Sequence, residues 1–244
     1  MSWILAAGAA TGLGAIGLLT VRRPSERLLD SLLGFTAGVM LAATSFSLLV
    51  PGLEQGSVGE VLAGFALGSA FIALLDARIP HAHARFREKG GMAAEERAAQ
   101  ERSVLLLTAL TIHNIPEGLA VGLAFAAGGA DLGVPLALAI GIQNVPEGFA
   151  AAAPLVGAGV SRRSASLVAA ATGAVEPPAA LAAFFAFEFA DALLAAGLGF
   201  AAGAMLYVIV DELIPESHGH GHELGGSLAL LAGFALMLVL DNAL

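Results

Sequence analysis

Two related hexapeptides, HNIPEG at residues 113–118 and QNVPEG at residues 143–148, carry the main structural information in this sequence. Each lies in the middle of a long apolar run, where a membrane-spanning helix would place hydrocarbon side chains. An ionisable side chain at the centre of a membrane helix costs about 2.5–3.5 kcal/mol on insertion scales, so such residues usually mark a site or a pathway. The two stretches therefore predict a membrane protein with a polar site at mid-depth.

The composition supports a membrane protein. Of the 244 residues, 57% are hydrophobic and 13% are charged, whereas soluble domains carry about 25% charged residues. The 31 glycines fit closely packed membrane helices, and several lie four residues apart, as in Gly8/Gly12, Gly64/Gly68 and Gly118/Gly122. The absence of cysteine excludes disulfides and thiolate metal sites. The net charge of −9 leaves no basic surface for nucleic acid.

Eight apolar segments are long enough to cross a bilayer as helices. They cover residues 2–21, 31–50, 59–77, 103–127, 133–156, 165–187, 192–213 and 226–243 of what we interpret as one transmembrane domain, 1–244. All eleven Lys and Arg residues fall in the connections after the first, third and fifth segments. Because positive loops tend to stay in the cytoplasm, the long connection 78–102 is predicted to be cytoplasmic and both termini extracytoplasmic.

The spacing within each hexapeptide gathers its polar side chains on one helix face. His113 and Glu117 are four residues apart, and Asn114 and Glu117 are three apart, so all three are neighbours on a helix. The second hexapeptide repeats this arrangement with Gln143, Asn144 and Glu147. A third carboxylate, Glu176, lies inside the sixth apolar segment.

Each hexapeptide also contains a proline, Pro116 or Pro146, which has no N–H and leaves one helical carbonyl without its partner. Inside a membrane such a carbonyl is tolerated only where it faces protein, water or an ion. Transporters often build ion sites from helices that are broken at mid-depth. We therefore expect a break in both helices, with two half-sites facing each other.

The donor set indicates a divalent cation. Carboxylate and amide oxygens with one imidazole argue against magnesium and calcium, and toward zinc, iron(II), cadmium or manganese. Three carboxylates could share two ions, with Glu117 and Glu147 bridging them. Clustered carboxylates are also expected to take up protons and release them to a metal, which would make transport depend on pH.

Two other interpretations remain open at this point. Polar residues in membrane helices also serve as hydrogen-bonded contacts between helices. Two metals bridged by carboxylates also catalyse hydrolysis, so a membrane-embedded di-metal hydrolase is an alternative. The sequence contains no H-E-x-x-H stretch, which makes an enzyme the weaker alternative.

The paired hexapeptides resemble the signature of the ZIP (Zrt/Irt-like protein) divalent metal transporters, in the bacterial GufA-like branch. The resemblance covers essentially the whole chain. It implies an all-α integral membrane fold of eight transmembrane helices in a 3+2+3 arrangement, with the outer triplets related as inverted repeats. It also implies a homodimer in the lipid bilayer of the bacterial inner membrane that moves divalent metal ions into the cytoplasm by elevator-type alternating access.

The resemblance further implies a binuclear centre holding up to two ions, zinc first and otherwise cadmium, iron(II) or manganese. One position would use His113, Glu117, Gln143 and Glu147, and its neighbour would use Asn114, Asn144 and Glu176 together with the two bridging glutamates. Met40 matches a further ligand position on the second helix, although a methionine there is equally suited to packing. Asn144 stands where some relatives have aspartate, so the second position is less negative.

Other polar residues are candidates for the transport pathway. Ser47, Glu54 and Asp241 would lie at the outer entrance, and Asp76, Asp211 and Glu212 at the cytoplasmic exit. The histidines of two predicted cytoplasmic loops, His81, His83, His218, His220 and His222, resemble the His-rich segments of the family that capture released metal. The alternatives are charges that simply reach water at helix ends, and a solvated loop without a specific role.

Overall fold

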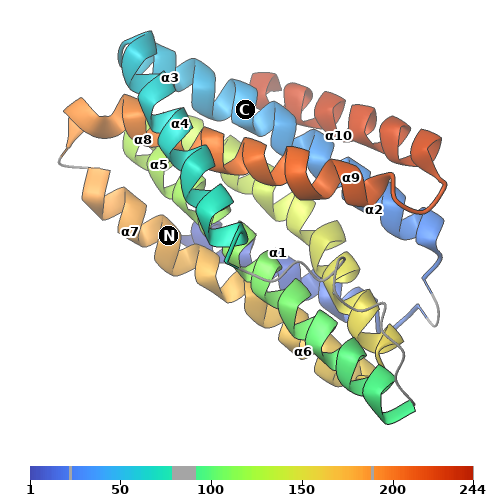
Figure 1. Cartoon of the computed structure of the whole chain (residues 1–244). Helices are drawn as coiled ribbons and strands as arrows, with labels where there is room; N and C mark the ends of the chain where they lie inside the picture. Colours follow the sequence, from blue (N-terminus) through green and yellow to red (C-terminus); the bar gives the residue numbers. More distant parts are fainter. Residues whose placement is uncertain (22–23, 79–91, 188–189, 244) are drawn as a thin grey trace.

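A computed structural model describes residues 1–21, 24–78, 92–187 and 190–243, with the backbone alone for 92–107, 109, 110 and 191. Throughout this part of the chain the regular structure is helical (Figure 1). The helices are α1 (Ser2–Gly17), α2 (Glu26–Ala42), α3 (Val50–Gln55), α4 (Val58–Asp76), α5 (Met92–Gly157), α6 (Arg162–Thr172), α7 (Glu176–Phe187), α8 (Asp191–Val208), α9 (Ile214–Ser217) and α10 (Glu223–Ala243). Three irregular helical segments join neighbours without a loop: the π-helices Ala43–Leu49 and Ile209–Leu213, and the 3-10 turn Gly173–Val175.

Six helical stretches among the described residues are long and apolar enough to cross a membrane. They are residues 26–55, 58–76, 111–157, 162–187, 192–217 and 223–243, and α1 is apolar but shorter. Large apolar side chains point outward from the bundle, for example Leu67 on α4 and Leu231 on α10, while a set of polar side chains is buried inside. The protein is therefore a multi-pass helical membrane protein.

Helix α5 consists of two helices joined by a sharp turn at two glycines. Gly128 and Gly129 are the residues of α5 with non-helical dihedral angles, and Gly129 has φ +57°, which favours glycine. Beyond the turn, a Cβ placed on Gly133 would lie 2.4 Å from the Phe125 ring. The two halves of α5, residues 92–127 and 130–157, thus run back along each other and bring the two hexapeptides together.

The expected break at each hexapeptide is wrong, because α5 keeps helical dihedral angles through both prolines. The glycine that follows each Pro-Glu pair packs directly on a neighbouring backbone. A Cβ on Gly118 would lie 2.4 Å from the carbonyl oxygen of Glu176, and one on Gly148 would lie 2.0 Å from that of Thr11. These close backbone contacts hold α5 against its neighbours directly after Pro116 and Pro146, and the helix continues although each proline removes one hydrogen bond.

Several helix ends differ from the predicted segments because local caps set them. Ser25 accepts the backbone N–H of Leu28, so the second span begins at Glu26, before the apolar run. A capping box between Ser57 and Glu60 starts α4. Helix α5 begins at Met92, inside the connection expected over 78–102.

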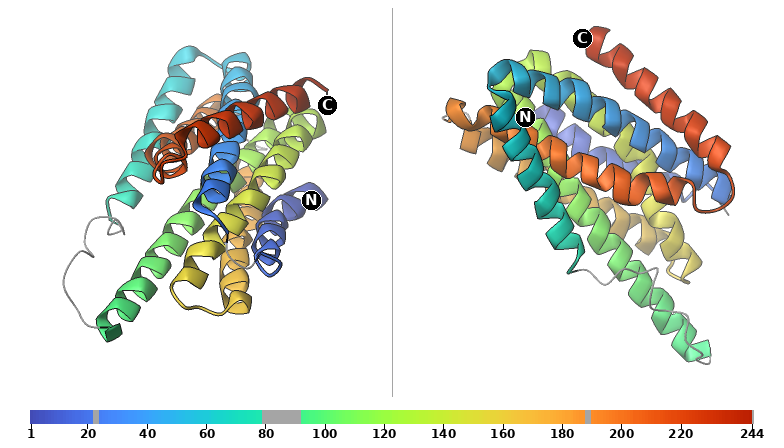
Figure 2. Two further views of the ribbon diagram at one scale, coloured as in Figure 1. Left: turned by 90° about the vertical axis from the view of Figure 1, so that its right-hand side faces the viewer. Right: turned by 45° about the horizontal axis from the view of Figure 1, so that its top comes forward.

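Close backbone contacts through glycine divide the helices into two sets. In the first set, α1, α6 and α7 pack with α5; Gly14, for instance, faces the carbonyl of Val145. In the second set, α10 packs along α2, and α4 packs along α8. Figure 2 shows α10 on the outside of the bundle beside α2. Among the described glycines, every contact under 3 Å with a backbone atom of another helix joins helices of the same set.

The second set is built from two similar pairs of helices. The stretch GFTAGVML at 34–41 of α2 recurs as GFAAGAML at 199–206 of α8. Gly38 of α2 packs on the carbonyl of Leu230 in α10, and Gly203 of α8 packs on that of Phe65 in α4, at the same offset along the chain. Each repeated stretch leads into a π-helix and then a proline, Pro51 or Pro215.

The two repeated helices run in opposite directions. Gly52, after the first π-helix, lies against Leu198 near the start of α8. Asp30, near the start of α2, contacts His220 beyond the end of α9. The residues that follow each repeated motif therefore lie at opposite ends of the bundle.

Candidate metal centre

The polar side chains of the two hexapeptides and the third predicted carboxylate are all buried. They are His113, Asn114 and Glu117 in the first half of α5, Gln143, Asn144 and Glu147 in its second half, and Glu176 at the start of α7. The hairpin at Gly129 brings the two hexapeptides to the same level, and the 3-10 turn before Glu176 places α7 beside them.

Two amide–carboxylate pairs hold this group together. Nε2 of Gln143 donates a hydrogen bond to Oε1 of Glu117 over 2.7 Å. Nδ2 of Asn144 donates to both carboxylate oxygens of Glu176, at 2.8 and 2.9 Å. Thr11 of α1 donates a further, longer bond of 3.4 Å to Oε1 of Glu176. Each amide thus presents its N–H side to the carboxylate of another helical segment.

The imidazole of His113 is bound by a residue from the other set of helices. Its Nε2 lies 2.7 Å from Oε1 of Glu212, in the π-helix after α8, and the Glu212 side chain is 30% exposed. Glu147 is within electrostatic reach of both His113 and Glu212. Glu212, expected at the exit of the pathway, therefore lies next to the predicted ligands.

The three buried glutamates are close enough to repel one another when charged. Glu117 is within electrostatic reach of Glu147 and Glu176, and Glu147 also acts on Glu176. Removing carboxylates from water is unfavourable unless hydrogen bonds or a cation compensate for the lost hydration. A group of this kind is chemically suited to a divalent cation.

Several buried oxygen acceptors around these carboxylates have no hydrogen-bond donor within the described part of the chain. They are Oδ1 of Asn114, Oε2 of Glu117, Oε1 of Gln143, Oδ1 of Asn144 and Oε2 of Glu147. Buried acceptors in folded proteins are nearly always paired, so an unpaired group of this size needs an explanation. Carboxylate and amide oxygens of this type bind hard or borderline cations.

The present side-chain arrangement is not itself a finished metal site. Among the residues described, no three His, Asp or Glu side chains converge closely enough to hold one ion. The amide N–H groups donate to the carboxylates and Glu212 contacts His113, so these contacts engage atoms that a metal ion would need. The residues fit a cation by their chemistry and burial, and they would have to rearrange to bind it.

Met40 is buried on α2, and its helix touches the centre. Thr36, four residues earlier and hence on the same face, donates a hydrogen bond of 3.3 Å to the backbone carbonyl of Gln143. The same face of α2 that carries Met40 thus lies against the second hexapeptide. Thr36 and Thr11 were not predicted, because hydroxyls in apolar helices are common and carry no spacing signal.

The pathway residues fall into two groups and one outlier. Oγ of Ser47 donates to Oδ1 of Asp241 over 2.9 Å, joining the first π-helix to α10. Asp76, Asp211 and Glu212 all act electrostatically on Tyr207, so they share one neighbourhood, and Glu212 joins this neighbourhood to His113. Glu54 is exposed at the end of α3 and, in the described structure, makes no hydrogen bond or ion pair with another candidate residue.

Tyr207, on which these three acids act, was not predicted. It directly follows the repeated GFAAGAML motif, and this position could have drawn attention to it. Of the loop histidines, His218 and His220 make defined contacts and His222 is exposed. His81 and His83 lie outside the described residues.

Comparison with known proteins identifies the family. A family model described as ZIP zinc transporter matches residues 78–241. The chain is 42% identical to the zinc transporter GufA of Myxococcus xanthus, over 98% of this chain and 96% of that protein. The chain belongs to the ZIP family. It is also 42% identical to the zinc transporter ZIPB of Bordetella bronchiseptica, over 97% of this chain and 78% of that protein.

A more distant ZIP relative is the human zinc transporter ZIP11, 34% identical over 96% of this chain and 94% of its own. ZIP proteins are transporters and not enzymes, so the di-metal hydrolase considered as an alternative is set aside.

Proposed function

We propose that this ZIP protein carries divalent metal ions, zinc first and also cadmium, iron(II) or manganese, across the bacterial inner membrane into the cytoplasm. Its relatives GufA and ZIPB are named zinc transporters, which supports zinc as the cargo. The observation that carries the proposal is a set of five buried oxygens on the two hexapeptides that have no hydrogen-bond donor among the described residues: three from amides and one each from the carboxylates of Glu117 and Glu147. Together with the three neighbouring carboxylates, so many acceptors without a donor favour a cation as their partner.

The proposed centre binds up to two ions after a small rearrangement. Turning the amides of Gln143 and Asn144 about their last torsion would exchange N–H for oxygen and point an acceptor toward the carboxylates. Glu117 and Glu147 then bridge the two ions, His113 completes the first position, and Asn114 and Glu176 complete the second. Met40 is a candidate ligand for the first ion, since it shares a helix face with Thr36.

The proposed motion is a sliding of one set of helices past the other. Close glycine contacts lock each set internally, which supports two rigid bodies. Contacts between the sets include three hydrogen-bonded or ionic links: His113 with Glu212, Thr36 with the Gln143 carbonyl, and Gln55 with the carbonyl of Ala127. Polar links of this kind can break and re-form, whereas interlocked backbones cannot.

The proposed topology has eight spans in a 3+2+3 order. It counts α1 as a span and each half of α5 separately, in addition to the remaining long helical stretches. The repeated contacts of α2–α10 and α4–α8 support an inverted repeat. The charge distribution favours extracytoplasmic termini, and the family resemblance favours a homodimer.

Ser47 and Asp241 would then line the outer entrance, and Asp76 and Asp211 the cytoplasmic exit. Glu54 remains a weaker candidate for the entrance, because it is exposed and unconnected to the other two residues in the described structure.

Zinc uptake by proteoliposomes containing the purified protein tests this function. The variants Glu117→Gln and Glu147→Gln keep the side-chain size and remove a bridging carboxylate each, so uptake should fall to the level of empty liposomes. Asp131→Asn is the matched control, because this exposed acid lies in the turn region of α5 away from the hexapeptides. Uptake that persists in both glutamate variants would exclude the proposed centre.

A further inference from the structure

The hydroxyl group of Thr44 is buried and has no role in the proposed centre. Thr44 lies in the first π-helix, Ala43–Leu49, and is 1% exposed. Its Oγ1 has no hydrogen-bond partner within the described part of the chain. A buried hydroxyl without a partner is unfavourable, and π-helical segments inside α-helices are frequently found at functional sites. The hydroxyl of Thr44 therefore needs an explanation.

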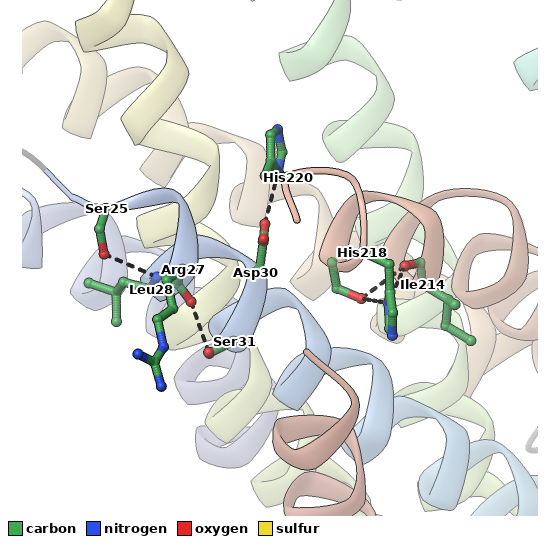
Figure 3. Close-up of polar contacts among 9 residues, drawn as sticks. Ser25, Arg27, Leu28, Asp30, Ser31, Ile214, His218 and His220 are labelled. Carbon is green, nitrogen blue, oxygen red and sulfur yellow. Dashed lines mark hydrogen bonds and ion pairs between the residues drawn. The ribbon is translucent and has the colours of Figure 1, made fainter. Parts of the chain in front are cut away.

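Other hydroxyls on the same helical stretch bond to their own backbone. Ser31 on α2 donates over 2.8 Å to the carbonyl of Arg27, four residues earlier, as Figure 3 shows. Ser45, the neighbour of Thr44, donates in the same way to the carbonyl of Leu41 over 2.8 Å. Among the described residues Thr44 makes no bond of this kind, so its hydroxyl is available to a group other than the backbone.

The second copy of the repeated motif shows that packing at this position does not require a hydroxyl. Thr44 is the third residue after GFTAGVML, and Ile209 is the third residue after GFAAGAML. Counted back from the proline that follows each copy, the equivalent of Thr44 is Val208. Both residues are aliphatic and buried, with 0% of Ile209 and 2% of Val208 exposed. The hydroxyl is therefore a property of the copy that leads to Ser47, and not of the fold.

Thr44 lies between the proposed entrance and the proposed centre along the continuous helical stretch from α2 to α3. Ser47 at the entrance is three residues further on. Met40 is four residues earlier and on the same helix face, and Thr36, four residues earlier again, donates to a backbone carbonyl of the second hexapeptide. The π-helix itself packs against α5, α8 and α10. Thr44 thus places one oxygen donor at a level between entrance and centre.

We propose that the hydroxyl of Thr44 is a transient oxygen ligand for the divalent metal ion on its way from the Ser47–Asp241 entrance to the central site. The oxygen replaces one water molecule of the ion's shell during passage and holds no ion at rest. A neutral oxygen suits this step, because a pathway needs intermediate positions that bind weakly enough for the ion to leave. The role of Thr44 rests on the proposed function, since it requires a metal ion that travels along this route.

Zinc uptake by proteoliposomes containing the full-length protein tests this role with two variants. Thr44→Val removes the hydroxyl and keeps the branched shape of the side chain, whereas Thr44→Ser keeps the hydroxyl. The uptake rate at saturating zinc should fall about three- to tenfold in Thr44→Val, the range for loss of one neutral polar contact, and stay close to the unmutated rate in Thr44→Ser. Ser45→Ala is the matched control: its hydroxyl is bonded to the backbone, so the rate should not change.

Two equilibrium measurements separate this role from a structural one. Removal of an unpaired buried hydroxyl should raise the unfolding temperature of Thr44→Val in chelator, whereas loss of a structural contact would lower it. Equilibrium dialysis should give Thr44→Val the zinc affinity of the unmutated protein, because the ligands of the central site are unchanged. The expected variant is thus more stable, binds zinc equally well and transports it more slowly.

Four results would overturn the role of Thr44: an unchanged uptake rate in Thr44→Val, a lower unfolding temperature of this variant, a weaker zinc affinity, or equal slowing in Ser45→Ala. Failure of the proposed function gives a different result, because uptake would then be absent from the unmutated protein or persist in Glu117→Gln. Abolished uptake in Glu117→Gln beside an unchanged rate in Thr44→Val would reject the role of Thr44 alone.

Discussion

In the proposed centre, Glu212 would compete with zinc for His113, and this competition gives a quantitative prediction. The Nε2–Oε1 contact of 2.7 Å engages a nitrogen that the proposed centre needs. In that centre, zinc could use the nitrogen only after the contact with Glu212 has opened. In the variant Glu212→Gln, the partner of His113 keeps its size and loses its charge, so the imidazole should be easier to release.

The size of the effect follows from the environment of the pair. Hydrogen bonds to charged groups contribute about 1.5–3 kcal/mol when shielded from water, and fully exposed ion pairs contribute about 0.2–1 kcal/mol. Glu212 is 30% exposed and His113 only 5%, so the pair falls between these limits. Removing about 1 kcal/mol of competition should tighten zinc binding by about fivefold.

Zinc affinity is measured by equilibrium dialysis of the purified protein near neutral pH, and transport by uptake into proteoliposomes. Glu212→Gln should bind zinc more tightly yet transport it more slowly, because Glu212 also links the two sets of helices. Asp211→Asn removes the adjacent, exposed charge and should leave the affinity unchanged. If Glu212→Gln instead weakens zinc binding, Glu212 is itself a ligand and the competition argument is refuted.

Three further predictions concern packing, charge and pH. In Gly38→Ala the new Cβ would lie 1.9 Å from the carbonyl oxygen of Leu230 on the neighbouring helix. The unfolding temperature should therefore fall by an amount that corresponds to about 1–3 kcal/mol of overpacking. Gly12→Ala is the control: its Cβ would lie 3.5 Å from the nearest atom, so the unfolding temperature should change little. Asn144→Asp replaces an N–H donor 2.8 Å from the Glu176 carboxylate by a second negative charge. Thermal scans should show a lower unfolding temperature in chelator and a larger rise of that temperature on adding zinc than in the unmutated protein. An equal change of the unfolding temperature with and without zinc would contradict this. The contact with Asp30 raises the pKa of His220 in the folded protein above its unfolded value of about 6.5. The pair therefore stabilises the fold fully below about pH 6.5, and this stabilisation is lost as pH rises through the higher pKa of the folded state. In chelator, His220→Gln should therefore lower the unfolding temperature more at about pH 5.5 than at about pH 9, and a constant difference would argue against the pair.

Residue spacing predicted the local geometry of the hexapeptides. Helical periodicity places His113, Asn114 and Glu117 on one face, and the chain needed only the Gly128–Gly129 turn to bring the second hexapeptide opposite. The prediction of broken helices was wrong. Each proline removes only one hydrogen bond, and close packing at Gly118 and Gly148 compensates for that loss. Such packing depends on distant segments and is invisible to local sequence rules.

The position of Glu212 could not be predicted from a regular helix. A π-helix inserts extra residues per turn and rotates the side chains that follow it onto a different face. Glu212 lies inside such a segment, so the usual periodicity does not describe its direction. The repeated motif GFxAGxML, in contrast, was readable in the sequence and would have paired the two π-helices in advance.

The antiparallel course of the two repeated helices limits how the ends of the bundle can differ. Two copies of one building unit, turned upside down relative to each other, offer the same backbone to both membrane surfaces. Four residues before the proline, one copy has Ser47 and the other has Asp211. Positions of this kind, where the two copies carry different side chains, can give the two ends of the bundle different chemistry although their backbones are alike.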